Sequence, residues 1–282
     1  MRRLLPVVLI LLAAALTPHR AALAVAAPGK TPDVRSQAVL VMDRDNSAVL
    51  YSQQADLVAP IASITKLMTA LVILDGKQPL NETITVTDAD RIRGRGAASR
   101  IPIGAKLRRG DLLRLALMSS ENRAAHVLGR NYPGGEAVFV RTMNAKAKAL
   151  GMTQSRFVDP SGLSSDNVAS SRDLAKLIIA ASRSPVIREY STGTQYAVKV
   201  GKKMLEFHNT NVLVRDPNWD ISVQKTGYIS EAGQCLVLQA RIAGRDVVIV
   251  LLNSFGKYTR VADARRIRQW MEHRPVLGRN QS

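Results

Sequence analysis

The order of strand-like and helix-like segments limits the fold of this chain more than any other feature of its sequence. Short apolar runs with strand character stand near both ends, whereas apolar residues at helical spacing fill the middle. The strand-like runs cover residues 37–42, 48–52, 221–228, 235–242 and 247–252. Turn-like residues separate neighbouring runs by short connections, which favour antiparallel pairing. We therefore expect one five-stranded antiparallel sheet flanked by helices, an α/β architecture of the α+β type.

The helix-like segments fill the middle of the chain and its C-terminal end. They cover a stretch from Pro60 to Gly76, residues 111–118, a continuation to about 129, and residues 136–150, 171–182 and 259–272. Pro60 suits a first helical turn, where its missing N–H costs nothing, and Gly76 suits a C-cap. Residues 84–87 are a further strand candidate. Because the sequence has no internal repeat or linker, we expect residues 27–282 to form a single domain.

The first residues have the pattern of a secretory signal peptide. Arg2 and Arg3 precede an apolar run over residues 4–16, which is too short for a comfortable membrane span. Small-residue cleavage sites follow at residues 22–24 and 24–26. We expect residues 1–26 to be removed on export, and an uncleaved membrane anchor is the alternative.

The single cysteine and the net charge limit the chain's chemistry and partners. Cys235 has no partner for an intrachain disulfide, and its apolar surroundings predict a buried structural residue. The formal net charge is +18, of which +15 remains without the three arginines of residues 1–26. No basic run is interleaved with aromatic residues, which argues against nucleic acid. An anionic envelope polymer or membrane surface is the better electrostatic partner, and a merely solvated basic surface is the alternative.

Residues 59–70 combine an apolar helical pattern with two reactive groups, the hydroxyl of Ser63 and the amine of Lys66. Positions three apart share a helix face, so the amine can reach the hydroxyl. A helix N-terminus favours developing negative charge, and a serine becomes a useful nucleophile when a base adjoins it. The spacing alone is weak evidence, because Ser-x-x-Lys also begins at Ser222 and Ser254.

Two further motifs distinguish Ser63 from the other two matches. Ser-x-x-Lys, Ser-x-Asn and Lys-Thr-Gly together are typical of serine-active penicillin-binding enzymes. The chain contains them in this order at residues 63–66, 120–122 and 225–227. Residues 165–167 read Ser-Asp-Asn and offer a second match to the middle motif. We favour residues 120–122, because they interrupt an apolar helical segment, whereas residues 165–167 follow a glycine in a turn-rich loop.

The chemistry of acyl transfer explains the three catalytic candidates, Ser63, Lys66 and Ser120. Ser63 can attack a carbonyl carbon, and Lys66 can accept its proton only as a neutral amine. Burial and a second cation, for which Lys225 is the candidate, both lower the pKa of a lysine. Ser120 can then relay a proton to the leaving amine.

The other motif residues suit substrate binding. The amide of Asn122 can bond to substrate backbone or to Lys66. Lys225 and Thr226 suit a substrate carboxylate. Gly227 lets substrate backbone approach the edge of its strand.

This set of motifs resembles the low-molecular-mass penicillin-binding proteins, the serine D-alanyl-D-alanine peptidases, over nearly the whole chain after residue 26. Residues 119–125, 157–163, 208–211 and 255–259 are most similar to the D-alanyl-D-alanine endopeptidase subgroup, of the penicillin-binding protein 7 type. The resemblance implies a β-lactamase/transpeptidase-like fold with a helical subdomain. It also implies hydrolysis of D-alanyl cross-links between peptidoglycan stem peptides through an acyl-serine intermediate.

The same resemblance implies roles and partners. Ser63 would be the acylated nucleophile, Lys66 the base and Ser120 the proton shuttle, with the backbone N–H groups of Ser63 and Tyr228 as oxyanion hole. Peptidoglycan would be the substrate, β-lactam antibiotics covalent inhibitors, and the periplasm the location, with no cofactor and no metal. The short segment after residue 227 leaves no room for the second β-domain and amphipathic anchor of carboxypeptidase relatives. We therefore expect a soluble or loosely attached enzyme, with peripheral membrane association left open.

Other functions compete with this interpretation. A D-alanyl-D-alanine carboxypeptidase differs only in the leaving group, and a non-catalytic penicillin- or peptidoglycan-binding protein would have no use for the intact motifs. A class A β-lactamase needs a deacylating glutamate, and none of Glu136, Glu189 and Glu206 has the Glu-x-x-Asn setting of that class. His126 and His208 lack metal-ligand spacing, which argues against a metallopeptidase; His126 reads as a packed helix residue. The sequence also lacks the Gly-x-Ser-x-Gly elbow of Ser-His-Asp hydrolases.

Overall fold

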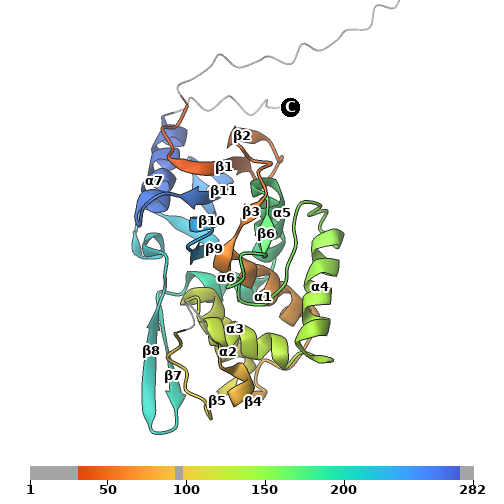
Figure 1. Ribbon diagram of the computed structural model, residues 1–282. Helices are drawn as coiled ribbons and strands as arrows, with labels where there is room; N and C mark the ends of the chain where they lie inside the picture. The colour runs from red at the N-terminus through yellow and green to blue at the C-terminus, as the bar shows by residue number, and fades with distance from the viewer. Residues whose placement is uncertain (1–30, 93–97, 274–282) are drawn as a thin grey trace, which may run out of the picture. The chain divides into compact units, whose positions relative to one another are not determined.

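Five antiparallel strands form a sheet that brings the N-terminal and C-terminal segments together (Figure 1). The computed structural model describes residues 31–92 and 98–273, all within one compact unit. Across the sheet the strands are β2 (Val49–Gln53), β1 (Ser36–Asp43), β11 (Arg245–Ser254), β10 (Gly233–Ile242) and β9 (Asp220–Ile229). The register sets Val41 opposite Ile249, so the N-terminal hairpin continues the C-terminal meander. The predicted five-stranded sheet is confirmed.

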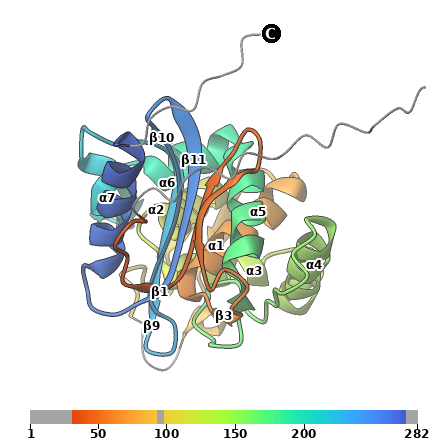
Figure 2. The same cartoon turned by 90° about the horizontal axis from the view of Figure 1, so that it is seen from above.

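Different helices cover the two faces of the sheet (Figure 2). On one face α7 (Thr259–Glu272) packs over a cluster that includes Leu238. On the other face α5 (Ser171–Ser182) packs over a cluster that includes Val237. Successive side chains of a strand point to opposite faces, so the central strands are apolar on both. This explains the continuous apolar runs of their sequences.

Helix α1 (Thr65–Asp75) lies at the centre of the helical part of the fold. All its residues from Thr65 to Ile73 are buried. Because even its polar residues Lys66 and Thr69 are buried, the helix is enclosed on all sides. The helices packed against it are α2 (Arg109–Met118), α3 (Asn122–Arg130), α4 (Gly135–Ala149) and α5. Together they form the predicted helical subdomain.

Helix α1 begins later than the sequence predicted. Pro60 does not lie in its first turn but in β3 (Ala59–Pro60), which pairs with β6 (Val168–Ala169). A 3₁₀ turn, η1 (Ala62–Ile64), follows before α1. The prediction for Pro60 was wrong because β3 takes its partner from a distant part of the chain, which local periodicity cannot reveal. The predicted C-cap at Gly76 is confirmed.

One helix and one hairpin lie where the sequence predicted nothing. They are α6 (Pro185–Thr192) and the pair β7 (Gln195–Val200) and β8 (Lys203–His208), and the hairpin extends away from the sheet in Figure 1. Most residues of the hairpin are exposed or only partly buried. It therefore lacks the strict apolar alternation by which a half-buried strand is recognised.

The remaining elements are short. Strand β4 (Thr83–Thr85) pairs with β5 (Lys106–Arg108), and η2 (Asp88–Asp90) and η3 (Val212–Arg215) are 3₁₀ turns. The other predicted helices and strands match the observed ones within two residues at each end. The predicted signal peptide lies outside the described residues, and the single-domain boundary at residue 27 stays a prediction. No helix in the described ranges is long and apolar enough to cross a membrane.

Candidate active site

Ser63 and Lys66 lie where the chain passes from η1 into α1. Lys66 Nζ is 2.8 Å from Ser63 Oγ, within hydrogen-bond distance. Ser63 keeps 9% of its surface exposed, whereas Lys66 is completely buried. The predicted contact between amine and hydroxyl is present, although the serine belongs to the 3₁₀ turn and not to the helix itself.

Lys66 is an amine enclosed by hydrogen-bond acceptors. Besides Ser63, its Nζ contacts Asn122 Oδ1 at 2.7 Å and the carbonyl oxygen of Ser161 at 2.5 Å. Burial lowers the pKa of Lys66 to about 7, against the opposing effect of the Asp159 and Glu121 carboxylates. Burial disfavours the charged form of an amine. Near neutral pH Lys66 can therefore take up the proton of Ser63.

Ser120 and Asn122 belong to the connection between α2 and α3. Ser120 has a positive φ of 60°, a conformation that is strained for a residue with a side chain. Glu121 caps α3 by accepting the backbone N–H of Arg123 at 2.9 Å. This sharp connection sets Ser120 Oγ 3.0 Å from Lys225 Nζ and Asn122 Oδ1 against Lys66. The middle motif thus touches both lysines.

The competing match at residues 165–167 has a different environment. Asn167 is fully buried, and its amide nitrogen donates to Asp159 Oδ2 at 2.5 Å. Its amide oxygen accepts the backbone N–H of Val158 at 3.0 Å. These contacts hold the loop around residues 159–167 together. The hydrogen bonds of Asn167 therefore serve the loop and not the cleft.

Lys225 on β9 faces Ser63 from the opposite wall of the cleft. It is completely buried, and its Nζ also donates to the carbonyl oxygen of Thr226 at 2.8 Å. Burial holds the pKa of Lys225 well below its ordinary value, and the charges of Lys66 and Arg260 lower it further. Burial is thus the main cause of the lowered pKa of both lysines.

The rest of the Lys-Thr-Gly segment also lines this wall. Thr226 Oγ1 is 2.6 Å from Thr210 Oγ1, and Tyr228 is 59% exposed. A Cβ atom on Gly227 would lie 2.9 Å from the carbonyl oxygen of Ile61 and 3.2 Å from the backbone nitrogen of Ser63. The sequence suggested that this glycine lets substrate approach the strand. In the structure the close neighbour is the backbone of the turn that carries Ser63.

The loop after Phe157 supplies groups that sequence reasoning assigned no role. The Asp159 carboxylate accepts the backbone N–H groups of Ser161 at 2.6 Å, Gly162 at 2.7 Å and Ser164 at 3.0 Å. These bonds hold the carbonyl oxygen of Ser161 against Lys66. Burial raises the pKa of Asp159, but the hydroxyl of Ser161 and these N–H groups outweigh it and lower the pKa. The sequence reads this segment as a turn-rich loop. Its similarity to the endopeptidase subgroup was the only available signal.

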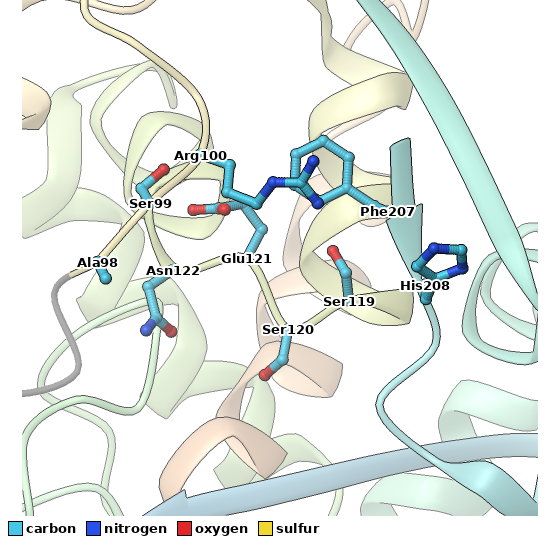
Figure 3. A pocket seen from close by; sticks show the side chains of 9 residues that line it. All are labelled: Ala98, Ser99, Arg100, Ser119, Ser120, Glu121, Asn122, Phe207 and His208. Carbon is cyan, nitrogen blue, oxygen red and sulfur yellow. The ribbon is translucent and has the colours of Figure 1, made fainter. Parts of the chain in front are cut away.

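A pocket of about 350 Å³ extends from the middle motif (Figure 3). Ser120 and Asn122 line it near the reactive pair, and Arg100 and Phe207 line its far end. The guanidinium carbon of Arg100 lies 4.7 Å from the centroid of the Phe207 ring. The cleft therefore continues from the serine and lysine groups toward a cationic side chain.

The remaining candidate residues lie apart from the reactive pair. His126 on α3 packs with Nδ1 3.3 Å from Glu136 Oε2, and His208 lines the pocket of Figure 3. Cys235 is fully buried with its pKa raised by burial to about 11, as expected of a structural thiol. Among the described residues, no group of three or more His, Cys, Asp or Glu side chains could hold a metal ion.

Solved structures with the same architecture are known. A D-alanyl-D-alanine carboxypeptidase from Mycobacterium tuberculosis superimposes with a TM-score of 0.81 at 28% identity, over 89% of this chain and 96% of that one. A DD-transpeptidase from Streptomyces gives a TM-score of 0.80 at 25% identity, over 86% and 98%. The fold is thus that of the penicillin-binding D,D-peptidases and transpeptidases.

Sequence comparison assigns the family. Residues 24–256 match the model of the D-alanyl-D-alanine carboxypeptidase family, and the chain belongs to this family of serine peptidases. A D-alanyl-D-alanine endopeptidase of Pseudomonas aeruginosa is 48% identical over 85% of this chain and 78% of its own length. One of Escherichia coli is 44% identical over 90% and 83%. The predicted family is confirmed.

Proposed function

We propose that this protein is a periplasmic D-alanyl-D-alanine endopeptidase, which hydrolyses D-alanyl cross-links between peptidoglycan stem peptides through an acyl-serine intermediate. The observation that carries the proposal is the Ser63–Lys66 pair. Its two reactive atoms are 2.8 Å apart, and burial lowers the pKa of the amine to about 7. A nucleophile with an adjoining base of this pKa suits acyl transfer at neutral pH.

Acylation of Ser63 is the first half of the reaction. Lys66 removes the proton of Ser63 as Oγ attacks the carbonyl carbon of the D-alanyl residue. The backbone N–H groups of Ser63 and Tyr228 stabilise the negative charge on the carbonyl oxygen. The carbon–nitrogen bond of the cross-link then breaks. Ser120, which contacts Lys225 Nζ at 3.0 Å, passes its proton to the leaving amine and takes up the proton that Lys66 had received, so that Lys66 is neutral again.

Deacylation completes the cycle. A water molecule gives a proton to Lys66 while its oxygen attacks the acyl carbon. The ester bond to Ser63 Oγ breaks, and Ser63 Oγ takes a proton back from Lys66, which restores the starting state. The products are a free D-alanyl carboxylate and the amine of the second peptide.

The proposed substrate-binding residues lie on the two walls of the cleft. Asn122 holds Lys66 in place through its 2.7 Å contact and orients substrate backbone. Lys225 and Thr226 bind a substrate carboxylate, and Gly227 keeps β9 close to the turn of Ser63. Tyr228 supplies a backbone N–H to the oxyanion hole. None of these roles needs a cofactor or a metal.

The names of the relatives support the endopeptidase, and the carboxypeptidase is the second candidate. Relatives at 44% and 48% identity are called endopeptidases, whereas a Bacillus subtilis relative called a carboxypeptidase is 27% identical. Both reactions use the same acylation step and differ in the amine that leaves. A non-catalytic binding protein is disfavoured, because binding alone requires no amine of lowered pKa beside the serine.

Location and inhibition follow from the proposed activity. Peptidoglycan lies outside the cytoplasmic membrane, so residues 1–26 would act as a cleaved signal peptide for export to the periplasm. The positive charge of the chain favours contact with anionic envelope surfaces, which leaves room for peripheral membrane association. β-Lactam antibiotics would acylate Ser63 in place of the D-alanyl carbonyl.

The deciding experiment compares two substrates with the purified protein lacking residues 1–26. We expect it to cleave a cross-linked muropeptide dimer into monomers, to bind labelled penicillin covalently, and to lose both properties in Ser63→Ala. If it trims only uncross-linked pentapeptide, it is a carboxypeptidase. If neither substrate changes and penicillin does not label the protein, the proposed function is wrong.

A further inference from the structure

We propose that the pocket beside Ser120 recognises the free C-terminal carboxylate of the stem peptide that leaves, and that Arg100 is the side chain that binds it. The inference deepens the proposed function and rests on it. Arg100 would thereby favour cross-linked peptides over a single D-alanine as leaving group. Arg100 would thus determine substrate specificity and would take no part in proton transfer.

The position of Arg100 suits it to bind an anion. Its guanidinium is stacked 4.7 Å from the centroid of Phe207, and its Nη1 donates to the carbonyl oxygen of Glu206. Both contacts tie it to the end of β8, and within the described ranges its guanidinium forms no ion pair with a carboxylate. A guanidinium fixed in this way can form a bidentate pair with a carboxylate.

Glu121, the one carboxylate in the pocket lining, accepts a hydrogen bond from a helix N-terminus. Glu121 is 8% exposed and caps α3 by accepting the N–H of Arg123 at 2.9 Å. Arg100 is exposed and lines the same pocket, with its guanidinium beside the Phe207 ring (Figure 3). An incoming group therefore meets the guanidinium, while the buried Glu121 stays committed to the helix.

The pocket lies on the side where the leaving group departs. Ser120, the proposed donor to the leaving amine, lines its inner end, and its volume of about 350 Å³ can hold part of a peptide. A single D-alanine has only one carboxylate, which Lys225 and Thr226 would bind. A leaving stem peptide has a second carboxylate at its own C-terminus. In the proposal, this second carboxylate is the group that pairs with Arg100.

The test uses Arg100→Ala and two muropeptide dimers, one with a free C-terminal carboxylate on the leaving peptide and one with that carboxylate amidated. We expect the variant to cleave the free-acid dimer with a kcat/KM about 10-fold lower, as the loss of a charged hydrogen bond implies. Wild type should cleave the amidated dimer more slowly by a similar factor. On the amidated dimer, Arg100→Ala and wild type should have the same kcat/KM.

Controls separate recognition from general damage. Pentapeptide trimming and the rate of labelling by penicillin should stay within about two-fold of wild type in Arg100→Ala, because neither uses a second carboxylate. Arg100→Lys should recover part of the loss. Arg91→Ala, which removes an exposed arginine paired with Asp88 away from the pocket, should behave as wild type.

The outcomes distinguish the two proposals. If Arg100→Ala cleaves the free-acid dimer as fast as wild type, or loses as much on the amidated dimer, the pocket does not recognise this carboxylate. An equal loss in penicillin labelling would also overturn the inference, because it would mean general damage to the site. If wild type labels with penicillin but cleaves no dimer, the endopeptidase proposal fails and the inference fails with it.

Discussion

At the scale of single residues, Lys66 differs from an ordinary lysine in its burial and in its pKa. Its ammonium form would be solvated at the surface, but here it is completely buried with three oxygen acceptors around Nζ. Burial shifts the equilibrium toward the neutral amine. Nearby carboxylates partly oppose that shift and keep the pKa at about 7. The balance of these two effects sets the pH at which Ser63 can be activated.

The pH dependence of acylation follows from this balance. Because the neutral amine accumulates above its pKa, the rate of labelling by penicillin should rise with pH around a midpoint of about 7. Lys66→Arg should abolish the rise and lower the rate by at least about 100-fold, since a guanidinium stays protonated. Stopped-flow or gel-based labelling between roughly pH 5 and pH 9 measures both. A rate independent of pH in wild type would contradict the role of Lys66 as base.

Asp159 links the loop to Lys66 and gives a second prediction. Asp159→Asn removes a charge that raises the pKa of Lys66, and it replaces the oxygen that accepts from the backbone N–H of Ser164 and from Asn167 Nδ2 with an NH2 group that cannot accept. We expect the midpoint of the labelling profile to move to lower pH, and the free energy of unfolding to fall by about 3 kcal/mol. Urea denaturation measures the second effect.

The same loop offers a matched control. Asp166 is largely exposed and lies 3.6 Å from Arg156, so Asp166→Asn should change stability by less than about 0.5 kcal/mol. Equal effects of the two substitutions would mean that the Asp159 contacts do not hold the loop.

At the scale of elements, the site depends on the contact between β9 and η1. Residues of η1 lie against β9 and β10, and the positive φ of Ala62, 47°, lets the turn fit there. Gly162 of the loop packs so closely on the carbonyl of Ala62 that an added Cβ would lie 2.0 Å from its oxygen. The turn that carries Ser63 is thus held between a strand and a loop.

Gly227→Ala tests this packing. The added methyl group would lie 2.9 Å from the carbonyl oxygen of Ile61, so β9 or η1 must shift. We expect a loss of stability of about 1–3 kcal/mol and slower penicillin labelling, because Lys225 and Ser63 separate. Gly193→Ala is the control, since its nearest neighbours would lie at ordinary contact distances from 3.4 Å upward. Normal labelling by Gly227→Ala would show that the close contact is dispensable.

At the scale of the whole molecule, a buried carboxylate ties the first strand to the last helix. Asp263 on α7 is fully buried and accepts the backbone N–H of Ser36 at 2.7 Å and its hydroxyl at 2.6 Å. Its other oxygen accepts from Arg266 at 2.7 Å. Strand β1 also pairs with β11, so this contact fastens α7 to the strand that joins the N-terminal hairpin to the C-terminal meander.

Asp263→Ala should therefore destabilise the fold without altering the cleft. It leaves the buried backbone N–H of Ser36 unpaired, whereas the hydroxyl of Ser36 keeps Ser254 as a partner. The loss costs about 2 kcal/mol and lowers Tm by roughly 4–8 °C. Well below Tm, the rate of penicillin labelling should match wild type. Differential scanning calorimetry and labelling on one preparation test both statements, and a slower rate with an unchanged Tm would refute them.

Much of this architecture could be predicted, for identifiable reasons. Strands such as β10 and helices such as α5 are marked by local apolar patterns, and these were located within two residues. The hairpin of β7 and β8 was missed because its residues are mostly exposed. The first turn expected at Pro60 was wrong because its strand partner is remote in sequence.

The sequence by itself determined the motif residues, the five-stranded sheet and the family, because these depend on local patterns and on residue identity. Only the tertiary structure decided that the residues meet. It buries Lys66 deeply enough to lower its pKa to about 7, and it brings Lys225 to Ser120 across the cleft. It also sets the carbonyl of Ser161 against Lys66 and Arg100 against Phe207. The physical reason is that desolvation and hydrogen bonding depend on neighbours that are distant in the chain, whereas periodicity reports only on nearby residues.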